Sequence, residues 1–267
     1  SLMLTSDDFA LVAVDEASTD GTAAWLRSHG VFVIDKPSAS GLTESWNLGW
    51  RLWQQSNYDV LLIANNDLLY PSGSLTRLAE CVRANEVAGP VTTQYGIGAD
   101  FNGYQGVERL FGLDVATAQR ATDPLNYEEV QHNMTHDGWG QREEIPPVLW
   151  AETINGFLMG FSESTSRAQH SPQHFFNPDN IVFGQEGEMK QRLEDADIVP
   201  AVCTTSFTYH LKGMTVHNKA VDENAHWSND PNEYQRKAVS VNARQLTALI
   251  RIAKSLARQF SEDSTER

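Results

Sequence analysis

The 267-residue sequence has little cysteine and no long apolar run. No stretch of about 18 consecutive apolar residues occurs, so no segment is predicted to span a bilayer as a helix. The amino terminus lacks the basic and apolar regions of a signal peptide. The two cysteines, Cys81 and Cys203, lie far apart in apolar surroundings, which favours two buried thiols over a disulfide or a metal site. Together these absences favour a globular protein of the reducing cytoplasm.

Positive charge is also scarce. The chain carries 20 Lys and Arg residues against 35 Asp and Glu residues, which gives a formal net charge of −15 at pH 7. A field of this sign repels polyanions, so we expect no nucleic acid partner and no non-specific adhesion to anionic lipid. A ligand that bears phosphate must therefore be held by local devices: a metal ion, a helix amino terminus or a few placed basic groups.

Short apolar runs alternate with amphipathic stretches in the first third of the chain. Their periodicity predicts strands at residues 9–14, 31–34, 59–64 and 87–92, and helices at residues 23–29, 41–55 and 74–84. This alternation indicates an α/β fold with a mostly parallel sheet flanked by helices. A helical stripe of Trp46, Trp50 and Trp53 is expected to face the core.

Regular patterning fades after residue 95. Residues 96–148 are rich in Gly, Asn, Asp and aromatic residues with weak periodicity, which predicts long loops that form one wall of a binding site. Regular elements are expected again as strands at residues 153–161 and 198–204, a helix at 185–195 and a long amphipathic helix at 231–259. Glycines in the strand at 153–161 mark a place of close approach. With no internal repeat and no low-complexity linker, we expect one domain with a C-terminal helical appendage.

Polar residues end the apolar run at residues 61–64. Asn65, Asn66 and Asp67 come directly after it. The carboxyl end of a buried strand in an α/β protein is where ligands bind, and a lone carboxylate there suits a hard divalent cation shared with phosphate oxygens. The alternative is a turn whose Asn and Asp side chains cap their own backbone. This stretch alone leaves both interpretations open.

Two further acidic pairs occur where elements begin or end. Asp15 and Glu16 follow the first strand, and in a parallel sheet they project from the same edge as Asp67. Glu186 and Glu188 lie in the first turn of the helix expected at residues 185–195. Each pair has a structural alternative, because Asp15 can cap the helix that follows and Glu186 can be a solvated acid that favours a helix amino terminus.

Six segments, taken together, resemble the family 2 glycosyltransferases of the GT-A fold. VDEASTDGT is similar to the V-D-D-x-S-x-D-G-T segment of that family, and ANND is similar to its D-x-D motif. GLTESWNLG resembles the glycine-to-Asn-x-Gly helix, INGFLMGF the acceptor-side strand and FGQEGEMKQRL the E-D-x-D-L-x-x-R-L segment, and a later histidine appears in TYHLKG. The segments keep the family's order over residues 9–213, which implies a GT-A-type, Rossmann-like domain.

The resemblance implies a nucleotide-diphosphate sugar as donor and a divalent metal ion, Mn2+ or Mg2+. Asp15, with Glu16 beside it, would contact the base or the ribose of the nucleotide. Asp67 would bind the metal. Asn65 and Asn66 would shape the turn and touch the ribose or the sugar.

The resemblance also implies a catalytic base. Glu186 falls where the family places its catalytic Asp, when Arg192 is aligned with the family's Arg; Gln185 and Glu188 flank it. His210 would supply a second metal contact or a diphosphate contact, and its alternative is a hydrogen-bonded histidine at a strand end. One base opposite the leaving group gives inversion, while the metal neutralises the leaving charge. The implied reaction is hexosyl transfer to a hydroxyl of a glycan or of a lipid-linked acceptor.

On this interpretation residues 1–213 form the glycosyltransferase domain, with a nucleotide-sugar half at 1–95 and an acceptor half at 96–213. Residues 214–267 form a C-terminal helical extension. Trp139 and Trp150 are candidates for stacking on an acceptor sugar. A homodimer through the last helix and a peripheral contact with a membrane both stay open.

Three features depart from the family's pattern. Glu16 replaces the second Asp of the D-D pair, and Glu186 is one methylene longer than the usual Asp. No strand that ends in a Pro-x-Tyr-Asn-like segment precedes Asp15. A second function therefore stays open, a non-catalytic nucleotide-sugar binding or interaction module derived from a truncated or degenerate glycosyltransferase. A nucleotidyltransferase is disfavoured because no basic Gly-rich loop for a triphosphate occurs.

Overall fold

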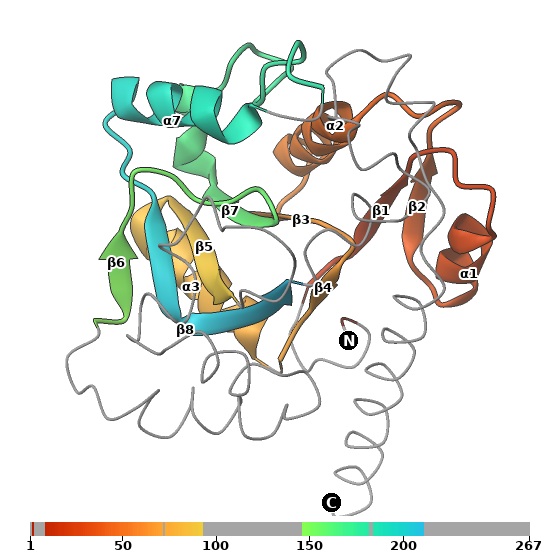
Figure 1. Ribbon diagram of the computed structural model, residues 1–267, viewed down its shortest axis with the longest axis horizontal. Coiled ribbons are helices and arrows are strands. Elements are labelled where there is room, and N and C mark those ends of the chain that lie inside the picture. Colours follow the sequence, from red (N-terminus) through yellow and green to blue (C-terminus); the bar gives the residue numbers. More distant parts are fainter. Residues whose placement is uncertain (1, 3–8, 72, 93–145, 182–183, 211–267) are drawn as a thin grey trace, which may run out of the picture.

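The computed structural model describes residues 2, 9–71, 73–92, 146–181 and 184–210. In this part of the chain helices flank the strands (Figure 1), which confirms the α/β fold class. The expected helix at residues 231–259, most of the irregular region at 96–148 and Trp139 lie outside the described residues. No helix in the described ranges is long and apolar enough to cross a membrane.

The first elements follow the predicted order of strands and helices. They are β1 (Val12–Asp15), α1 (Thr22–Ser28), β2 (Phe32–Asp35), α2 (Leu42–Gln54), β3 (Val60–Ala64), β4 (Leu68–Leu69), α3 (Ser74–Asn85) and β5 (Val87–Thr92). The later elements are β6 (Val148–Trp150), β7 (Leu158–Ser162), the 3-10 helix η3 (Glu163–Ala168), α7 (Gln185–Asp195) and β8 (Ala201–His210). The helices α1, α2, α3 and α7 begin and end within about one residue of the prediction, because capping and apolar periodicity are local signals.

Three strands are displaced from their predicted positions, and the first of them, β1, begins at Val12 instead of at residue 9. β7 begins at Leu158 because a turn comes first, in which Asn155 Oδ1 accepts a hydrogen bond from Phe157 N at 3.2 Å. β8 runs on to His210 because its second half pairs with both β5 and β4. β4 and β6 were not predicted, since strands of 2 and 3 residues are too short to reveal a period.

The strand directions are more mixed than the sequence pattern indicated. β1 pairs with β2 in parallel and β5 pairs with β8 in parallel, whereas β7 is antiparallel to β3 and β5, and β4 and β6 are antiparallel to β8. β7 lies between β3 and β5, although it follows both in the chain, and the strand order is β3-β7-β5-β8-β4.

Two apolar clusters fill the interior. The first lies beneath α2 and α7 and contains Trp46, Trp50 and Trp53, which confirms that the tryptophan stripe belongs to the core. The second contains Cys81 and Cys203, which are buried free thiols as expected. Close approach at β7 is also confirmed. A Cβ at Gly160 would collide with Val82 of α3, so the missing side chain lets α3 pack onto the sheet.

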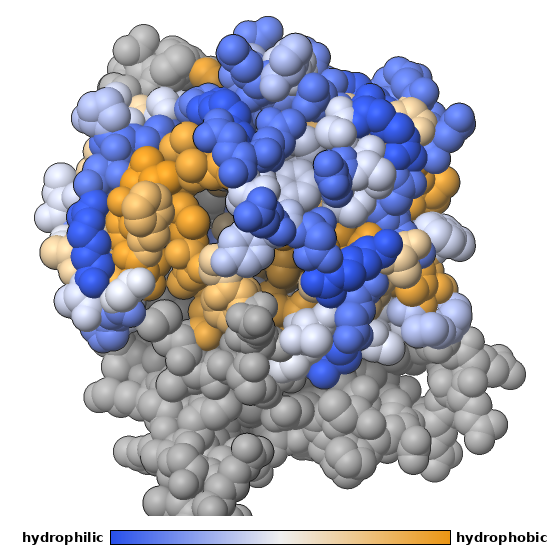
Figure 2. Space-filling model, turned by 180° about the vertical axis from the view of Figure 1, so that it is seen from behind, coloured by the Kyte–Doolittle hydropathy of each residue, from blue (hydrophilic) through white to orange (hydrophobic). Residues whose placement is uncertain are grey.

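The β1–β2 pair stands somewhat apart from the larger sheet. Among the described strands none joins this pair to the six-stranded sheet, although α2 packs against both β1 and β3. Val12 and its register partner Phe32 are 43% and 63% exposed. Figure 2 shows apolar side chains gathered at the surface on the rear face of the molecule.

Candidate active site

The end of β3 brings Asp67 next to His210. Asn65 N donates to Phe157 O at 2.8 Å, which closes the β3–β7 ladder, and the chain then turns into β4. Leu68 of β4 is the register partner of His210, the last residue of β8. Asp67 Oδ1 therefore lies 3.5 Å from His210 Nε2, with the two side chains 14% and 10% exposed. The His210 ring stacks on Phe157 with centroids 4.8 Å apart, so the two residues predicted to bind metal do lie together.

Two oxygens at this strand end are buried without a hydrogen-bond partner among the described residues. They are Asn65 Oδ1 and Asp67 Oδ1, whereas Asn66 is exposed. A buried acceptor left unpaired costs about 1–3 kcal/mol. Burial, and then the charge of Asp67, raises the pKa of the Tyr70 phenol above its usual range, so this carboxylate also acts on its neighbours.

A divalent cation fits this donor set. Carboxylate and amide oxygens are the ligands that Mg2+ and related hard cations take, and such ions commonly keep few protein ligands and share substrate phosphates. In the described ranges no group of three or more His, Cys, Asp or Glu side chains is placed to hold a metal. An ion at Asp67 and His210 would therefore need oxygens from a bound ligand. The metal role of both residues stays a prediction.

Asp15 shapes the turn after β1. Its Oδ2 accepts a hydrogen bond from Ser18 N at 2.9 Å, and the residue is 7% exposed. Directly before α1, Asp20 Oδ1 accepts hydrogen bonds from Thr22 N at 3.0 Å and from Thr22 Oγ1 at 2.6 Å. These two hydrogen bonds lower the pKa of Asp20. Asp15 therefore orders the turn after β1 and does not cap α1, and its expected contact with a base or ribose stays a prediction.

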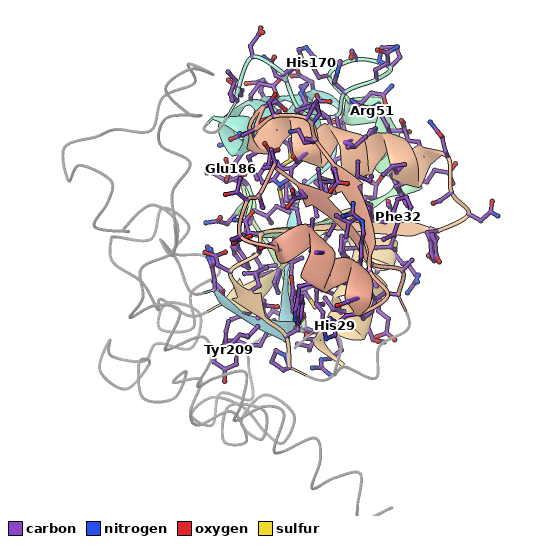
Figure 3. The ribbon with its side chains drawn as sticks, turned by 90° about the vertical axis from the view of Figure 1, so that its right-hand side faces the viewer. His29, Phe32, Arg51, His170, Glu186 and Tyr209 are labelled. Atoms are coloured by element: carbon purple, nitrogen blue, oxygen red, sulfur yellow. The ribbon has the colours of Figure 1, made fainter. Side chains whose placement is uncertain are left out.

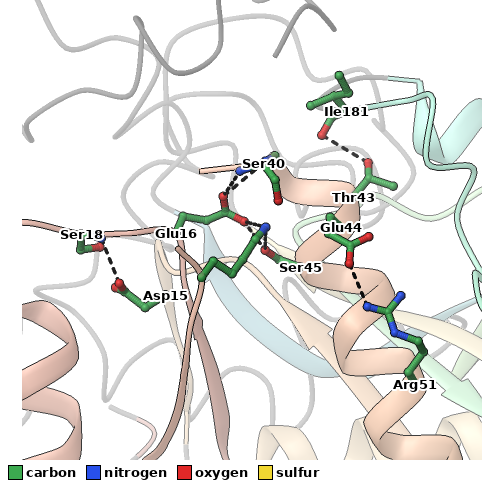
Figure 4. A network of polar contacts seen from close by, with 11 residues as sticks. Asp15, Glu16, Ser18, Ser40, Thr43, Glu44, Ser45, Arg51 and Ile181 are labelled. Carbon is green, nitrogen blue, oxygen red and sulfur yellow. Dashed lines mark hydrogen bonds and ion pairs between the residues drawn. The ribbon is translucent and has the colours of Figure 1, made fainter. Parts of the chain in front are cut away.

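Glu16 is engaged within the protein (Figure 4). Its carboxylate accepts hydrogen bonds from Lys36 Nζ and Ser45 Oγ, and also from Ser40 N at 2.9 Å and Gly41 N at 3.3 Å. These donors belong to the loop after β2 and to the first turns of α2. Glu16 thus anchors the amino terminus of α2, a role that the sequence did not indicate. Its expected contact with a base or ribose stays a prediction.

The amino terminus of α2 in turn holds the segment that leads into α7. Thr43 N donates to Ile181 O at 3.2 Å, and Thr43 Oγ1 donates to Asn180 O. Gln185, which is 1% exposed, donates through Nε2 to Thr43 Oγ1 at 2.7 Å and to Asn180 O at 3.1 Å. A Cβ at Gly41, which has φ +101°, would collide with Ile181. The start of α7 is therefore fastened to the amino terminus of α2.

Glu186 lies in the first turn of α7, at the margin of the described structure in Figure 3. Its Oε1 accepts a hydrogen bond from Gly156 N at 3.1 Å. Glu188 instead forms an ion pair with Arg192 of the same helix, with contacts of 2.9 and 2.8 Å. Glu188 is therefore paired with Arg192, whereas the Glu186 carboxylate is held by Gly156 N.

The turn before β7 contacts both Glu186 and the residues around Asp67. Gly156 touches Glu186, and the next residue, Phe157, touches Asn65 and His210. Sequence reasoning read this segment as a strand and missed the role of the turn. The signal was the pair of polar and small residues, Asn155 and Gly156, ahead of the apolar run. Trp150, a candidate for stacking on a sugar, is 63% exposed on β6.

Comparison with known proteins adds independent findings. No curated protein matches the chain. GalNAc-T7, crystallised with UDP, GalNAc and Mn2+, is 11% identical with a TM-score of 0.48, and the match covers 75% of this chain and 37% of that one. A mycobacterial protein is 15% identical with a TM-score of 0.39 and coverages of 75% and 57%. This chain therefore spans less than two thirds of the length of either solved structure.

A match to a family model shows which family the chain belongs to. The model described as glycosyl transferase family 2 matches residues 1–145, which is more than half of the 267 residues. This range includes the ends of β1 and β3, where Asp15 and Asp67 lie. The chain therefore belongs to glycosyl transferase family 2.

Proposed function

We propose that the chain catalyses metal-assisted, inverting transfer of a hexosyl group from a nucleotide-diphosphate sugar to a hydroxyl of a glycan or lipid-linked acceptor. The observation that carries the proposal is the Asp67 carboxylate, whose Oδ1 is buried without a hydrogen-bond partner in the described structure and lies 3.5 Å from His210 Nε2. An acid held in this way gains a partner when a cation and a diphosphate bind. Membership of the family supports the same reaction class.

The donor side is assigned to the ends of β1 and β3. Asp67 and His210 would hold Mn2+ or Mg2+, together with the amide oxygen of Asn65. When bound, the metal supplies charge neutralisation for the departing nucleoside diphosphate. Asp15, at the end of β1, is proposed to contact the base or ribose. The internal hydrogen bonds of Glu16 favour a scaffold role for that carboxylate.

Glu186 is the proposed general base. It accepts the proton of the acceptor hydroxyl while the hydroxyl oxygen forms a bond to the anomeric carbon. The bond from that carbon to the phosphate oxygen breaks on the opposite face, so the configuration inverts and the nucleoside diphosphate leaves with the electron pair. The transition state resembles an oxocarbenium ion. Gly156 N and the anchored start of α7 hold Glu186 in place for this step.

Substitution of Glu186 by Gln tests the base. The amide keeps the size of the side chain but cannot take a proton, so turnover should fall at least about 100-fold. Binding of UDP, GDP or dTDP with Mn2+, measured by calorimetry, should stay at the wild-type level. The matched control is Glu188→Gln, which changes the neighbouring acid of the same turn. Turnover of nucleotide sugars at the wild-type rate by Glu186→Gln would remove Glu186 from the mechanism.

The same measurements separate a second candidate, a binding module without catalysis. Its supporting observation is that no described strand joins β1 to β3 beside the proposed donor site. Binding of a nucleoside diphosphate without turnover of any UDP-, GDP- or dTDP-sugar by the wild-type chain favours this candidate. Absence of binding contradicts both functions.

A further inference from the structure

The turn at Gly156 and Phe157 contacts both the proposed base and the residues proposed to hold the metal. Phe157 O accepts a hydrogen bond from Asn65 N at 2.8 Å, and the Phe157 ring stacks on His210. Gly156 N donates to Glu186 Oε1 at 3.1 Å. Neighbouring residues of one turn are joined by a planar peptide bond, so the turn sets how far the base lies from the metal residues.

Glu186 occupies the space that a side chain at position 156 would need. A Cβ on Gly156 would lie 2.6 Å from Glu186 Oε1 and 2.7 Å from Trp46 Cη2. Trp46 is 5% exposed and packs on Phe176 with ring centroids 5.0 Å apart, so its ring has little room to retreat. The Glu186 carboxylate is the end of a flexible side chain. It can swing away when position 156 gains a methyl group, whereas the clash with Trp46 must be relieved by a small shift of the ring or of the backbone.

The backbone beneath Glu186 is held more firmly than its carboxylate. Gln185 is buried and donates to Thr43 Oγ1 and to Asn180 O. Among described residues, the hydrogen bond from Gly156 N is the contact that orients the Glu186 carboxylate. The adjacent glycine gives a natural comparison, because a Cβ on Gly187 would meet nothing within 4 Å.

We propose that Gly156 is a positioning residue for Glu186, because its N–H aims the carboxylate and its missing side chain leaves room for it. This inference rests on the proposed role of Glu186 as general base. A methyl group at position 156 turns the carboxylate away from the acceptor hydroxyl. The donor side keeps its contacts, since these run through Phe157 and the backbone of Asn65.

Kinetics of Gly156→Ala test the consequence. With Mn2+ and UDP-, GDP- or dTDP-sugars, kcat should fall about 100-fold, the scale expected when a reacting group is misplaced by 1 Å. KM for the donor and the affinity for the matching nucleoside diphosphate should stay at the wild-type level. Gly187→Ala should match the wild type in all three quantities. A wild-type kcat in Gly156→Ala overturns the inference, as does an equal loss in Gly187→Ala.

Spectroscopy tests the contact without any need for turnover. Selective 15N-glycine labelling gives at most 18 amide cross-peaks, and the Gly156 peak is the one that disappears in Gly156→Ala. This peak should move upfield in Glu186→Ala, where the hydrogen bond is lost, while the Gly49 and Gly160 peaks stay in place. A Gly156 peak that does not move contradicts the contact. Wild-type turnover in Glu186→Gln, in contrast, contradicts the proposed function itself.

A double variant, Gly156→Ala with Glu186→Asp, tests the inference even when Gly156→Ala alone does not fold. Glu186→Asp shortens the acid by one methylene and makes room for the new methyl group. We expect part of the Tm lost in Gly156→Ala to return in the double variant, and kcat of the double variant to equal that of Glu186→Asp alone, because the two residues are coupled. A double variant as unstable as Gly156→Ala would assign the conflict to Trp46 and overturn the inference.

Discussion

Two strand ends carry acids that look alike in the sequence but have opposite surroundings in the structure. After β1, the Glu16 carboxylate accepts hydrogen bonds from two side chains and two backbone N–H groups. After β3, Asp67 Oδ1 is buried without a hydrogen-bond partner in the described ranges. An acid whose oxygens all accept hydrogen bonds stabilises the fold. A buried acid oxygen without a hydrogen bond costs free energy until a ligand binds. The proposed donor site therefore has two parts: a scaffold part at Glu16, which holds the fold together, and a ligand-ready part at Asp67, which can still accept a ligand.

The largest effect is expected at the ligand-ready part. Asp67→Asn keeps the shape of the side chain and removes its charge. We expect Mn2+-dependent binding of a nucleoside diphosphate to weaken by more than about 100-fold, because even the loss of a residue behind a metal ligand costs about 10- to 100-fold. Urea unfolding should show little loss of stability, since Asp67 Oδ1 accepts no hydrogen bond in the described structure that the amide would lose. A wild-type affinity of Asp67→Asn, measured by calorimetry, would contradict the proposed metal role of Asp67.

An intermediate effect is expected at the scaffold part. Glu16→Ala removes the acceptor for the loop after β2 and for the start of α2, and should lower the free energy of unfolding by about 2 kcal/mol. Nucleoside diphosphate affinity at a temperature where the variant is folded should remain close to that of the wild type. Glu44→Ala, which removes an exposed partner of Arg51 on the same helix, is the matched control and should cost at most about 0.5 kcal/mol. Loss of affinity without loss of stability in Glu16→Ala would restore its expected contact with the nucleotide.

The smallest effect is expected at an acid outside the site whose oxygens accept hydrogen bonds. Glu86 accepts from Arg167 Nη2 at 2.8 Å and from Ser164 Oγ at 2.5 Å. The hydrogen bond from Arg167 is the main cause that lowers the pKa of Glu86 below its ordinary 4.5. Because the folded-state pKa is depressed, the stabilisation is present above pH 4.5 and is lost as the pH falls below that value.

The matching measurement compares the wild type with Glu86→Gln. The two side chains of the ion pair are 32% and 43% exposed, so the difference in free energy of unfolding at pH 7 should be at most about 1 kcal/mol. The difference should shrink between pH 5 and pH 3. A difference that grows as the pH falls contradicts the assigned cause.

Local signals predicted the helices and the position of the acids. α7 covers the expected residues, and Asp15 and Asp67 do lie at strand ends, because caps and apolar periodicity are written in a few adjacent residues. The partners of these acids lie far along the chain. Glu16 meets Gly41, and Glu186 meets a glycine 30 residues away. The Glu186 contact follows from the insertion of β7 between β3 and β5, and the Glu16 contact follows from the packing of α2 against β1. No local sequence pattern contains either arrangement.

The resemblance to a family supplied what periodicity did not. It pointed to His210 as a companion of Asp67, and the structure places the two side chains together through the pairing of β4 with β8. It did not point to Gly156 or Phe157, since their importance lies in what their backbone and ring touch. Residue types predict chemistry, but the position of a backbone N–H becomes visible only in the fold.

The most direct measurement is calorimetric titration of the wild-type chain with UDP, GDP and dTDP, each with and without Mn2+. The account predicts that at least one of them binds with Mn2+ and that its affinity falls sharply when Mn2+ is replaced by a chelator, because Asp67 and His210 meet the diphosphate through the cation. Equal affinity in the two conditions, or no binding of any of the three, would contradict the assignment of the β3 end as the donor site.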